Sequence, residues 1–91
     1  MYIIIEHEIG NPTSFWEAVK KTEIPSNLKL HQSLPNGEGT KAVCLWEAAI
    51  LDEVKEFVEE AVGEVSNNTY FAVNAENALG LPAAVTGGEV V

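Results

Sequence analysis

The architecture of this chain follows from residues 28–48, LKLHQSLPNGEGTKAVCLWEA, in which two apolar-rich runs flank a Pro-Asn-Gly-Glu-Gly cluster. That pattern is typical of a β-hairpin, with arms over about 28–34 and 40–48. The second arm is largely apolar on both of its sides, so we expect a central strand that is covered on both faces. One side carries Val43, Leu45 and Glu47, and the other carries Ala42, Cys44, Trp46 and Ala48.

The first arm contains His31, one of the two histidines of the chain. The loop over residues 35–39 does not fix the register of the hairpin. The sequence therefore leaves open whether His31 faces the same side as Cys44 or as Glu47. Strict alternation within the arm gives Leu28, Leu30, Gln32 and Leu34 to one face, and Lys29, His31 and Ser33 to the other.

A first strand is predicted at residues 2–8, where YIIIEHE begins with β-favouring residues. A helix is predicted over about 12–22. It begins either after Asn11 as the N-cap, or at a capping box formed by Ser14 and Glu17. Alternation in the strand puts Ile3, Ile5 and His7 on one face, and Tyr2, Ile4, Glu6 and Glu8 on the other.

A second helix is predicted within LDEVKEFVEEAVG, residues 51–63, with Asp52 as its N-cap and Gly63 as the glycine that follows its end. A last strand is predicted at residues 68–74. The apolar side of the helix carries Val54, Phe57, Val58, Ala61 and Val62, and its glutamates, Glu53, Glu56, Glu59 and Glu60, are expected to form a solvated face.

The elements follow the order strand, helix, strand, strand, helix, strand, which predicts an α+β fold, a ferredoxin-like βαββαβ sandwich of two layers. Right-handed crossovers give an antiparallel sheet with strand order 4-1-3-2, and the two most apolar strands are then central. We expect one domain over residues 1–91, with its ordered core at about 2–74 and a C-terminal tail at 75–91.

The predicted sheet has one face that its own helices do not cover, because two helices cover only one side. On a monomer that face would be a large exposed apolar patch. Burying about 600 Å² of apolar surface contributes on the order of 15 kcal/mol before association costs. The sequence therefore predicts a homodimer joined through this sheet face. The alternative is that residues 75–91 fold back over it.

The charge of the chain limits its partners. Its 91 residues carry 14 Asp and Glu against five Lys and no Arg, which gives a formal net charge of −9 at pH 7. Nucleic acid and anionic membranes would repel such a surface. No apolar run is long enough to span a membrane, and MYIIIEHEIG lacks the basic and cleavage regions of a secretory signal. We expect no nucleic-acid partner, no membrane and a cytoplasmic location.

Four side chains of the predicted sheet belong to types that bind metals. His7, His31 and Cys44 offer imidazole and thiolate ligands that suit Ni or Zn, and the Glu47 carboxylate would complete the shell. No two of them lie at a recognised ligand spacing. Each of the first three also has a structural explanation: a hydrogen-bonded residue at a strand end for His7, an exposed residue for His31, and a small buried apolar side chain for Cys44.

Three features of the chain together point to a protein family. His7 ends the first strand, the hairpin closes on VCLWEA at residues 43–48, and the second helix begins near LDEV at residues 51–54. These features resemble small bacterial ferredoxin-like proteins of unknown function, a group similar to a branch of the dimeric α+β-barrel proteins. The resemblance covers about residues 2–74. It implies a dimeric fold and, because some members are described as nickel-binding, a metal site to which His7 and Cys44 would belong.

Three functions remain open from the sequence. The first, which we favour, is a non-catalytic homodimer that binds a divalent metal or a small ligand through His7, His31, Cys44 and Glu47. The second is a small cofactor-independent oxygenase or isomerase of the dimeric α+β-barrel type, with His7 or His31 as general base in a cavity between sheet and helices. The third is a purely structural module. A cavity with an opening beside a histidine is the feature that the enzyme hypothesis requires.

Overall fold

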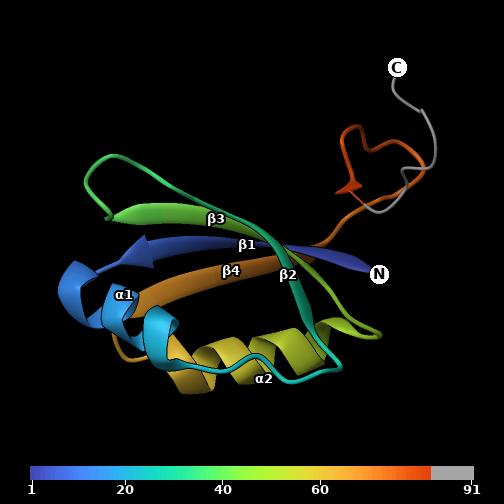
Figure 1. The fold of residues 1–91 in the computed structure, drawn as a ribbon. Helices are drawn as coiled ribbons and strands as arrows, with labels where there is room; N and C mark the ends of the chain where they lie inside the picture. The colour runs from blue at the N-terminus through green and yellow to red at the C-terminus, as the bar shows by residue number, and fades with distance from the viewer. Residues whose placement is uncertain (83–91) are drawn as a thin grey trace.

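The structure of the chain is a computed structural model that describes residues 1–82 (Figure 1). The predicted order of strands and helices is confirmed, and the fold is an α+β arrangement compatible with a ferredoxin-like sandwich. The last nine residues of the predicted tail lie outside the described residues. The elements are β1 Tyr2–Ile9, α1 Pro12–Lys21, β2 Lys29–Pro35, β3 Lys41–Glu47, α2 Leu51–Val62 and β4 Ser66–Ala72.

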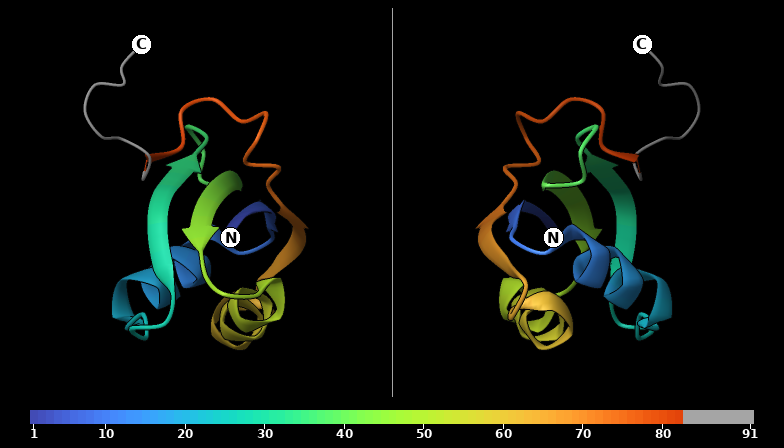
Figure 2. Two further views of the ribbon diagram at one scale, coloured as in Figure 1. Left: turned by 90° about the vertical axis from the view of Figure 1, so that its right-hand side faces the viewer. Right: turned by 90° about the vertical axis from the view of Figure 1, so that its left-hand side faces the viewer.

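The four strands form one antiparallel sheet in the order β2-β3-β1-β4, which is the predicted order read from the other edge. Both helices lie on the same side of this sheet (Figure 1; Figure 2). We call this side the helix face and the other side the open face. The central pair β1 and β3 places Ile5 opposite Cys44, and β4 places Tyr70 on the other side of Ile5.

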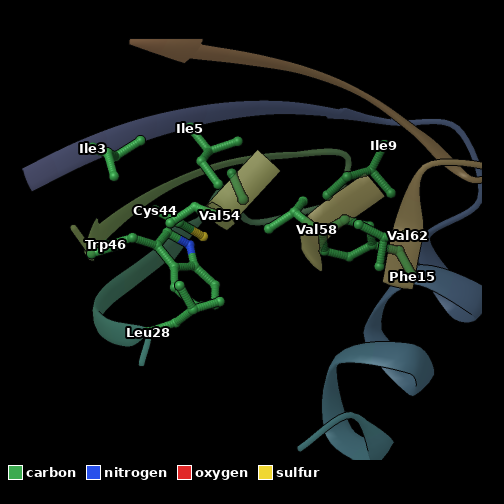
Figure 3. Packing of buried hydrophobic residues seen from close by; sticks show 12 residues of the cluster. Ile3, Ile5, Ile9, Phe15, Leu28, Cys44, Trp46, Val54, Val58 and Val62 are labelled. Atoms are coloured by element: carbon green, nitrogen blue, oxygen red, sulfur yellow. The ribbon is translucent and has the colours of Figure 1, made fainter. Parts of the chain in front are cut away.

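The hydrophobic core lies between the sheet and the helices (Figure 3). Its most completely buried side chains are Ile3 and Ile5 of β1 and Val54 of α2. The helix α2 repeats this contact one and two turns later with Val58 and Val62. The apolar spacing of the sequence therefore produced the helix face of the fold as predicted.

The start of α1 matches one of the two predicted alternatives. Asn11 is the N-cap, and its side-chain oxygen accepts a hydrogen bond from the backbone N–H of Ser14 at 3.1 Å. Pro12 occupies the first helical position, where its missing N–H costs nothing. The capping box that would have begun with Ser14 is therefore not used.

The predicted N-cap of α2 was wrong, whereas Gly63 follows the last helical residue, Val62, as predicted. Leu51 packs against the core and already belongs to the helix, so Ile50 is the N-cap and Asp52 lies in the first turn, where its charge favours the helix dipole. The backbone of Gly63 has a right-handed helical conformation, with a φ of −61°. A glycine is required there because a Cβ atom would lie 2.5 Å from the backbone oxygen of Glu59.

The strict alternation predicted for β2 was also wrong. The register shifts between Leu30 and Gln32, so His31 is the extra residue of a β-bulge. Leu30 pairs with Trp46 on the helix face, whereas Leu34 pairs with Val43 on the open face. Because an extra residue reverses the alternation, the two leucines predicted to share a face lie on opposite faces.

The hairpin loop is organised by Asn36. Its side-chain oxygen accepts hydrogen bonds from the backbone N–H groups of Thr40 and Lys41, at 2.9 and 3.1 Å. Gly39 has a φ of +73°, a conformation that favours glycine, and its carbonyl oxygen accepts a 3.1 Å hydrogen bond from Trp16 Nε1. This bond fixes α1 to the end of the hairpin.

The open face carries apolar side chains that the helices do not cover. Leu34, Val43 and Phe71 are 58%, 40% and 48% exposed. After β4 the chain leaves the sheet on the side away from the helices (Figure 1; Figure 2), so the described part of the tail lies on this side without burying those residues. Neither helix of the described part combines the length and the apolar character that crossing a membrane requires.

Candidate functional site

The four residues predicted as metal ligands lie on opposite faces of the sheet. His7 and Cys44 are buried on the helix face. His31 lies on the open face, where its Nε2 is 2.8 Å from Glu47 Oε1. Within residues 1–82, no three His, Cys, Asp or Glu side chains form a group that could hold a metal ion. One subunit therefore does not bring the predicted ligand set together.

The pair on the open face is a local hydrogen-bonded pair at the bulge of β2. The hydrogen bond from His31 lowers the pKa of Glu47 below its ordinary value. The ring of Tyr2 lies against the imidazole, with 5.6 Å between ring centroids. The question that the sequence left open is thus answered: His31 shares a face with Glu47 and not with Cys44.

A cavity of about 140 Å³ lies between the helices and the sheet. Its walls are predominantly apolar and contain no Lys, Asp or Glu. The space predicted to decide the enzyme hypothesis is therefore not filled, and a histidine lines it. The helices and the loop after α1 contribute Phe15, Trp16, Val19, Thr22, Ile24, Phe57, Val58, Ala61 and Val62, and the strands contribute His7, Leu30, Ser33, Cys44 and Trp46.

Both tryptophans of the chain line this cavity, but their indole N–H groups differ in hydrogen bonding. Trp16 Nε1 donates to the Gly39 carbonyl, as described above. Among the buried side-chain nitrogen and oxygen atoms of residues 1–82, Trp46 Nε1 is the one without a hydrogen-bond partner. Figure 3 shows its nitrogen on the side of the indole that faces Cys44, inside the core. A buried donor without an acceptor is costly, so this N–H is a position where an acceptor would be stabilised.

His7 is held by a chain of hydrogen bonds that begins on α2. Tyr70 donates its hydroxyl hydrogen to Glu59 Oε2, and Asn68 Nδ2 donates to the same oxygen at 2.9 Å. Asn68 Oδ1 then lies 2.5 Å from His7 Nδ1. The Ser66 hydroxyl lies 3.0 Å from the same amide oxygen.

This chain of bonds fixes the tautomer of His7. The Glu59 carboxylate only accepts hydrogen bonds, so the amide of Asn68 turns its NH₂ group toward it and its oxygen toward His7. That oxygen also only accepts, so Nδ1 of His7 carries the hydrogen. In the neutral ring the lone pair is then on Nε2, which makes no hydrogen bond within residues 1–82.

The pKa values around this chain follow from burial and from the same bonds. Burial lowers the pKa of His7, which favours the neutral ring, although Asn68 and the Glu59 charge act in the opposite direction. The hydrogen bonds from Tyr70 and Asn68 lower the pKa of Glu59. Burial and the neighbouring Glu59 raise the pKa of Tyr70. At neutral pH the histidine is thus uncharged and the carboxylate charged.

Cys44 is a buried thiol in the wall of the cavity. Burial raises its pKa, and the Ser33 hydroxyl, 3.7 Å from its sulfur, only partly opposes this. A raised pKa reduces the thiolate that nucleophilic chemistry or metal binding needs. The position is that of a small apolar side chain, as its structural explanation predicted.

A wider and more open hollow of about 530 Å³ lies against the sheet on the open side. Its lining includes the charged residues Glu6, Glu8 and Lys41 and the apolar Leu34 and Val43. Because it is open to solvent and mixed in character, it offers a surface for a partner more readily than an enclosed site for a small molecule.

The sequence did not identify the residues that orient His7. Glu59 was placed on a solvated face, and no role was predicted for Asn68. One signal was present: Asn68 and Tyr70 alternate in a strand next to β1, so two polar groups point to the helix face. No protein-family model matches this chain, and comparisons with curated proteins and with solved structures return no match.

Proposed function

We propose that this protein binds a small molecule in the cavity between its helices and its sheet, without catalysis, as a homodimer. The observation that carries the proposal is the unpartnered N–H of Trp46, which is covered by its neighbours in a residue that lines an apolar cavity. Ligand sites are typically apolar concavities with a few polar groups that fix orientation. Here those groups are Trp46, His7 and Ser33.

The size of the cavity limits the ligand to about one ring. Its volume of about 140 Å³ is close to that of an apolar cavity of roughly 150 Å³ that takes up benzene in another protein. The half-buried and exposed residues at its edge, such as Val19 and Ile24, would form the entrance on the side of α1.

Binding is tested by titrating the protein with toluene and with cyclohexanone while following the methyl resonances of Val19, Val58 and Leu30. We expect saturable shifts in these methyls. Ala61→Leu fills the cavity from α2 and should abolish the shifts, whereas Ala49→Leu, at an exposed loop position, should leave them unchanged. Absence of saturable shifts with both molecules in the wild type would contradict the proposal.

The homodimer is proposed through the open face. Leu34, Val43 and Phe71 are exposed there, and Ile4 lies between Leu45 and Phe71 in the ladder. The same face holds both signs of charge, with Glu8 opposite Lys41, so a second copy related by a twofold axis could offer opposite charges. A second copy is therefore the occupant that this face favours. Sedimentation at micromolar concentration tests it, and a folded monomer would contradict it.

An enzyme that transfers protons is the second candidate. It is favoured by one observation, the tautomer of His7, which leaves Nε2 with a lone pair as a general base requires. In this hypothesis Nε2 removes a carbon-bound proton next to a carbonyl group, and the electron pair of the broken C–H bond forms an enolate, as a cofactor-independent isomerase or oxygenase of the dimeric α+β-barrel type would begin its reaction. An isomerase then returns the proton from the imidazolium to carbon.

Deuterium exchange tests the enzyme hypothesis. The wild type in D₂O should exchange the α-hydrogens of cyclohexanone at least about tenfold faster than buffer. His7→Gln should lose this rate, and His31→Gln, which changes the histidine of the other face, should keep it. If cyclohexanone binds but exchanges at the rate of buffer, the enzyme hypothesis is wrong and the binding function remains.

Metal binding and the resemblance to small bacterial ferredoxin-like proteins remain proposals. In one subunit His31 and Glu47 supply two ligands, whereas a structural zinc site takes four. We therefore rank a Ni or Zn site below a small ligand. A purely structural role ranks below both, because it explains the hydrogen bond of His7 to Asn68 but not the unpartnered N–H of Trp46. The cytoplasmic location and the absence of a nucleic-acid partner rest on the charge and sequence arguments above.

A further inference from the structure

Of the ring N–H groups in the residues that line the cavity, two have a hydrogen-bond acceptor and one does not. His7 Nδ1 is already bonded to Asn68, and Trp16 Nε1 is bonded to Gly39. Trp46 Nε1 is buried and bonds to nothing within residues 1–82. A buried donor that lacks an acceptor retains the full cost of its lost hydration. The strongest polar requirement of the cavity is therefore for a hydrogen-bond acceptor beside Trp46.

The charge around the cavity disfavours ions. The titratable groups that line it are His7 and Cys44, and burial favours the neutral form of both, since it lowers the pKa of the first and raises that of the second. The nearby carboxylate of Glu59 is bonded to Tyr70 and Asn68. A charged ligand would lose its hydration without gaining a countercharge.

We infer that the cavity takes a neutral, ring-sized molecule whose carbonyl or ether oxygen accepts the hydrogen bond of Trp46 Nε1. This inference rests on the proposed binding function and adds the chemical class of the ligand. Because the indole nitrogen is covered by its neighbours, the oxygen reaches it through a small movement of the ring or of the Cys44 side chain. Recovery of the unmet hydrogen bond favours that movement.

The test uses two probes of nearly the same shape. Cyclohexanone carries a carbonyl oxygen, and methylenecyclohexane carries a CH₂ group in its place. Their affinities in water are not compared directly, because the ketone loses more hydration on entering an apolar site. Each affinity is instead measured in the wild type and in Trp46→Phe, which keeps an aromatic ring and removes the N–H. The ratio of the two changes isolates the hydrogen bond.

We expect Trp46→Phe to weaken cyclohexanone binding about fivefold to tenfold more than methylenecyclohexane binding. In the wild type, cyclohexanone should also move the Trp46 indole N–H proton resonance downfield, and methylenecyclohexane should not. Cyclohexanecarboxylate and cyclohexylammonium should bind more weakly than the ketone. The resonance is read in the wild type, so it decides the question even if Trp46→Phe does not fold.

Three outcomes would overturn the inference. If Trp46→Phe changes both affinities by the same factor and the indole proton stays in place, the hydrogen bond does not exist, although the cavity still binds ligands. If either charged probe binds more tightly than the ketone, the ligand is not neutral. If neither neutral probe binds to the wild type, the proposed function itself is wrong.

Discussion

The two faces of the sheet are built from the same four strands but have different contents. The helix face has a buried core, a cavity and a histidine, His7, held by a neutral amide. The open face has exposed apolar residues, charges of both signs and a histidine, His31, bonded to the carboxylate of Glu47. The helices cover one face only, and the open face keeps exposed apolar residues, although Leu45 and the side chain of His31 are buried on it. The comparison agrees with the proposals of small-molecule binding at the helix face and of subunit contact at the open face.

The largest difference expected between the faces is in folding stability. Ile5, fully buried on the helix face, should cost about 2–5 kcal/mol of unfolding free energy when changed to alanine. Leu34→Ala, on the open face, should cost the isolated subunit less than about 1 kcal/mol. Urea unfolding at several protein concentrations separates the stability of the subunit from that of the dimer. Equal losses for the two variants would contradict the assignment of the core.

The next largest effect is expected on association. Leu34→Glu combined with Phe71→Glu should weaken the proposed dimer on the order of 100-fold, because four like charges would enter the proposed interface. Analytical ultracentrifugation at micromolar concentration measures this, and circular dichroism checks that the fold is kept. Ile50→Glu, at an exposed position before α2, is the matched control and should remain dimeric. A double variant with unchanged association would place the interface elsewhere.

Thiol reactivity compares two neighbours on β3 that point to opposite faces. Cys44 is buried and its pKa is raised, so a disulfide reagent at pH 8 should modify it at least about tenfold more slowly than the unfolded chain. The variant Val43→Cys with Cys44→Ala moves the thiol to the open face and should react faster than the wild type. Measurement at a protein concentration where the variant is monomeric avoids protection by a partner. Equal rates would show that the helix face is not closed to the reagent.

The smallest effect is expected on the pH dependence of stability. Burial lowers the pKa of His7 below its ordinary 6.5, so the unfolded chain takes up its proton at a higher pH than the folded chain. The contribution of neutral His7 to folding stability is complete above pH 6.5. It is lost as the pH falls toward the pKa that His7 has in the folded chain. The pKa values of Glu59 and Glu47 are lowered from 4.5 in the folded chain. Their contribution to stability is therefore complete above pH 4.5 and is lost as the pH falls below it.

Denaturant unfolding between pH 7 and 5.5 measures this dependence. His7→Gln should reduce the loss of stability on acidification, and His31→Gln should change it less. An undiminished loss in His7→Gln would assign the effect to another group.

The sequence predicted which residues share a face in β1 and β3 but not in β2. Apolar alternation was enough for β1 and β3, because a one-residue shift would have exposed Ile3 or Trp46. In β2 the bulge at His31 reverses the alternation, and bulges leave no reliable composition signal. Asn36, Gly37 and Gly39 predicted the position of the hairpin loop but not the register of the two strands that it joins.

The site was less accessible to sequence reasoning than the fold. His7 and Cys44 were recognised by residue type, but their separation from His31 depends on the bulge. The orientation of His7 depends on Asn68 and Glu59, which are 61 and 52 positions away along the chain and meet it only after folding. The free N–H of Trp46 reflects three-dimensional packing, so no local pattern could have predicted it.

The most direct test of the account is one spectrum that contains both tryptophans. In a ¹H–¹⁵N titration of the wild type with cyclohexanone, the indole N–H of Trp46 should shift downfield and saturate. The indole N–H of Trp16, already bonded to Gly39, should move much less. A Trp46 resonance that stays in place while cavity methyl groups respond would contradict the assignment of this N–H as the group that receives the ligand.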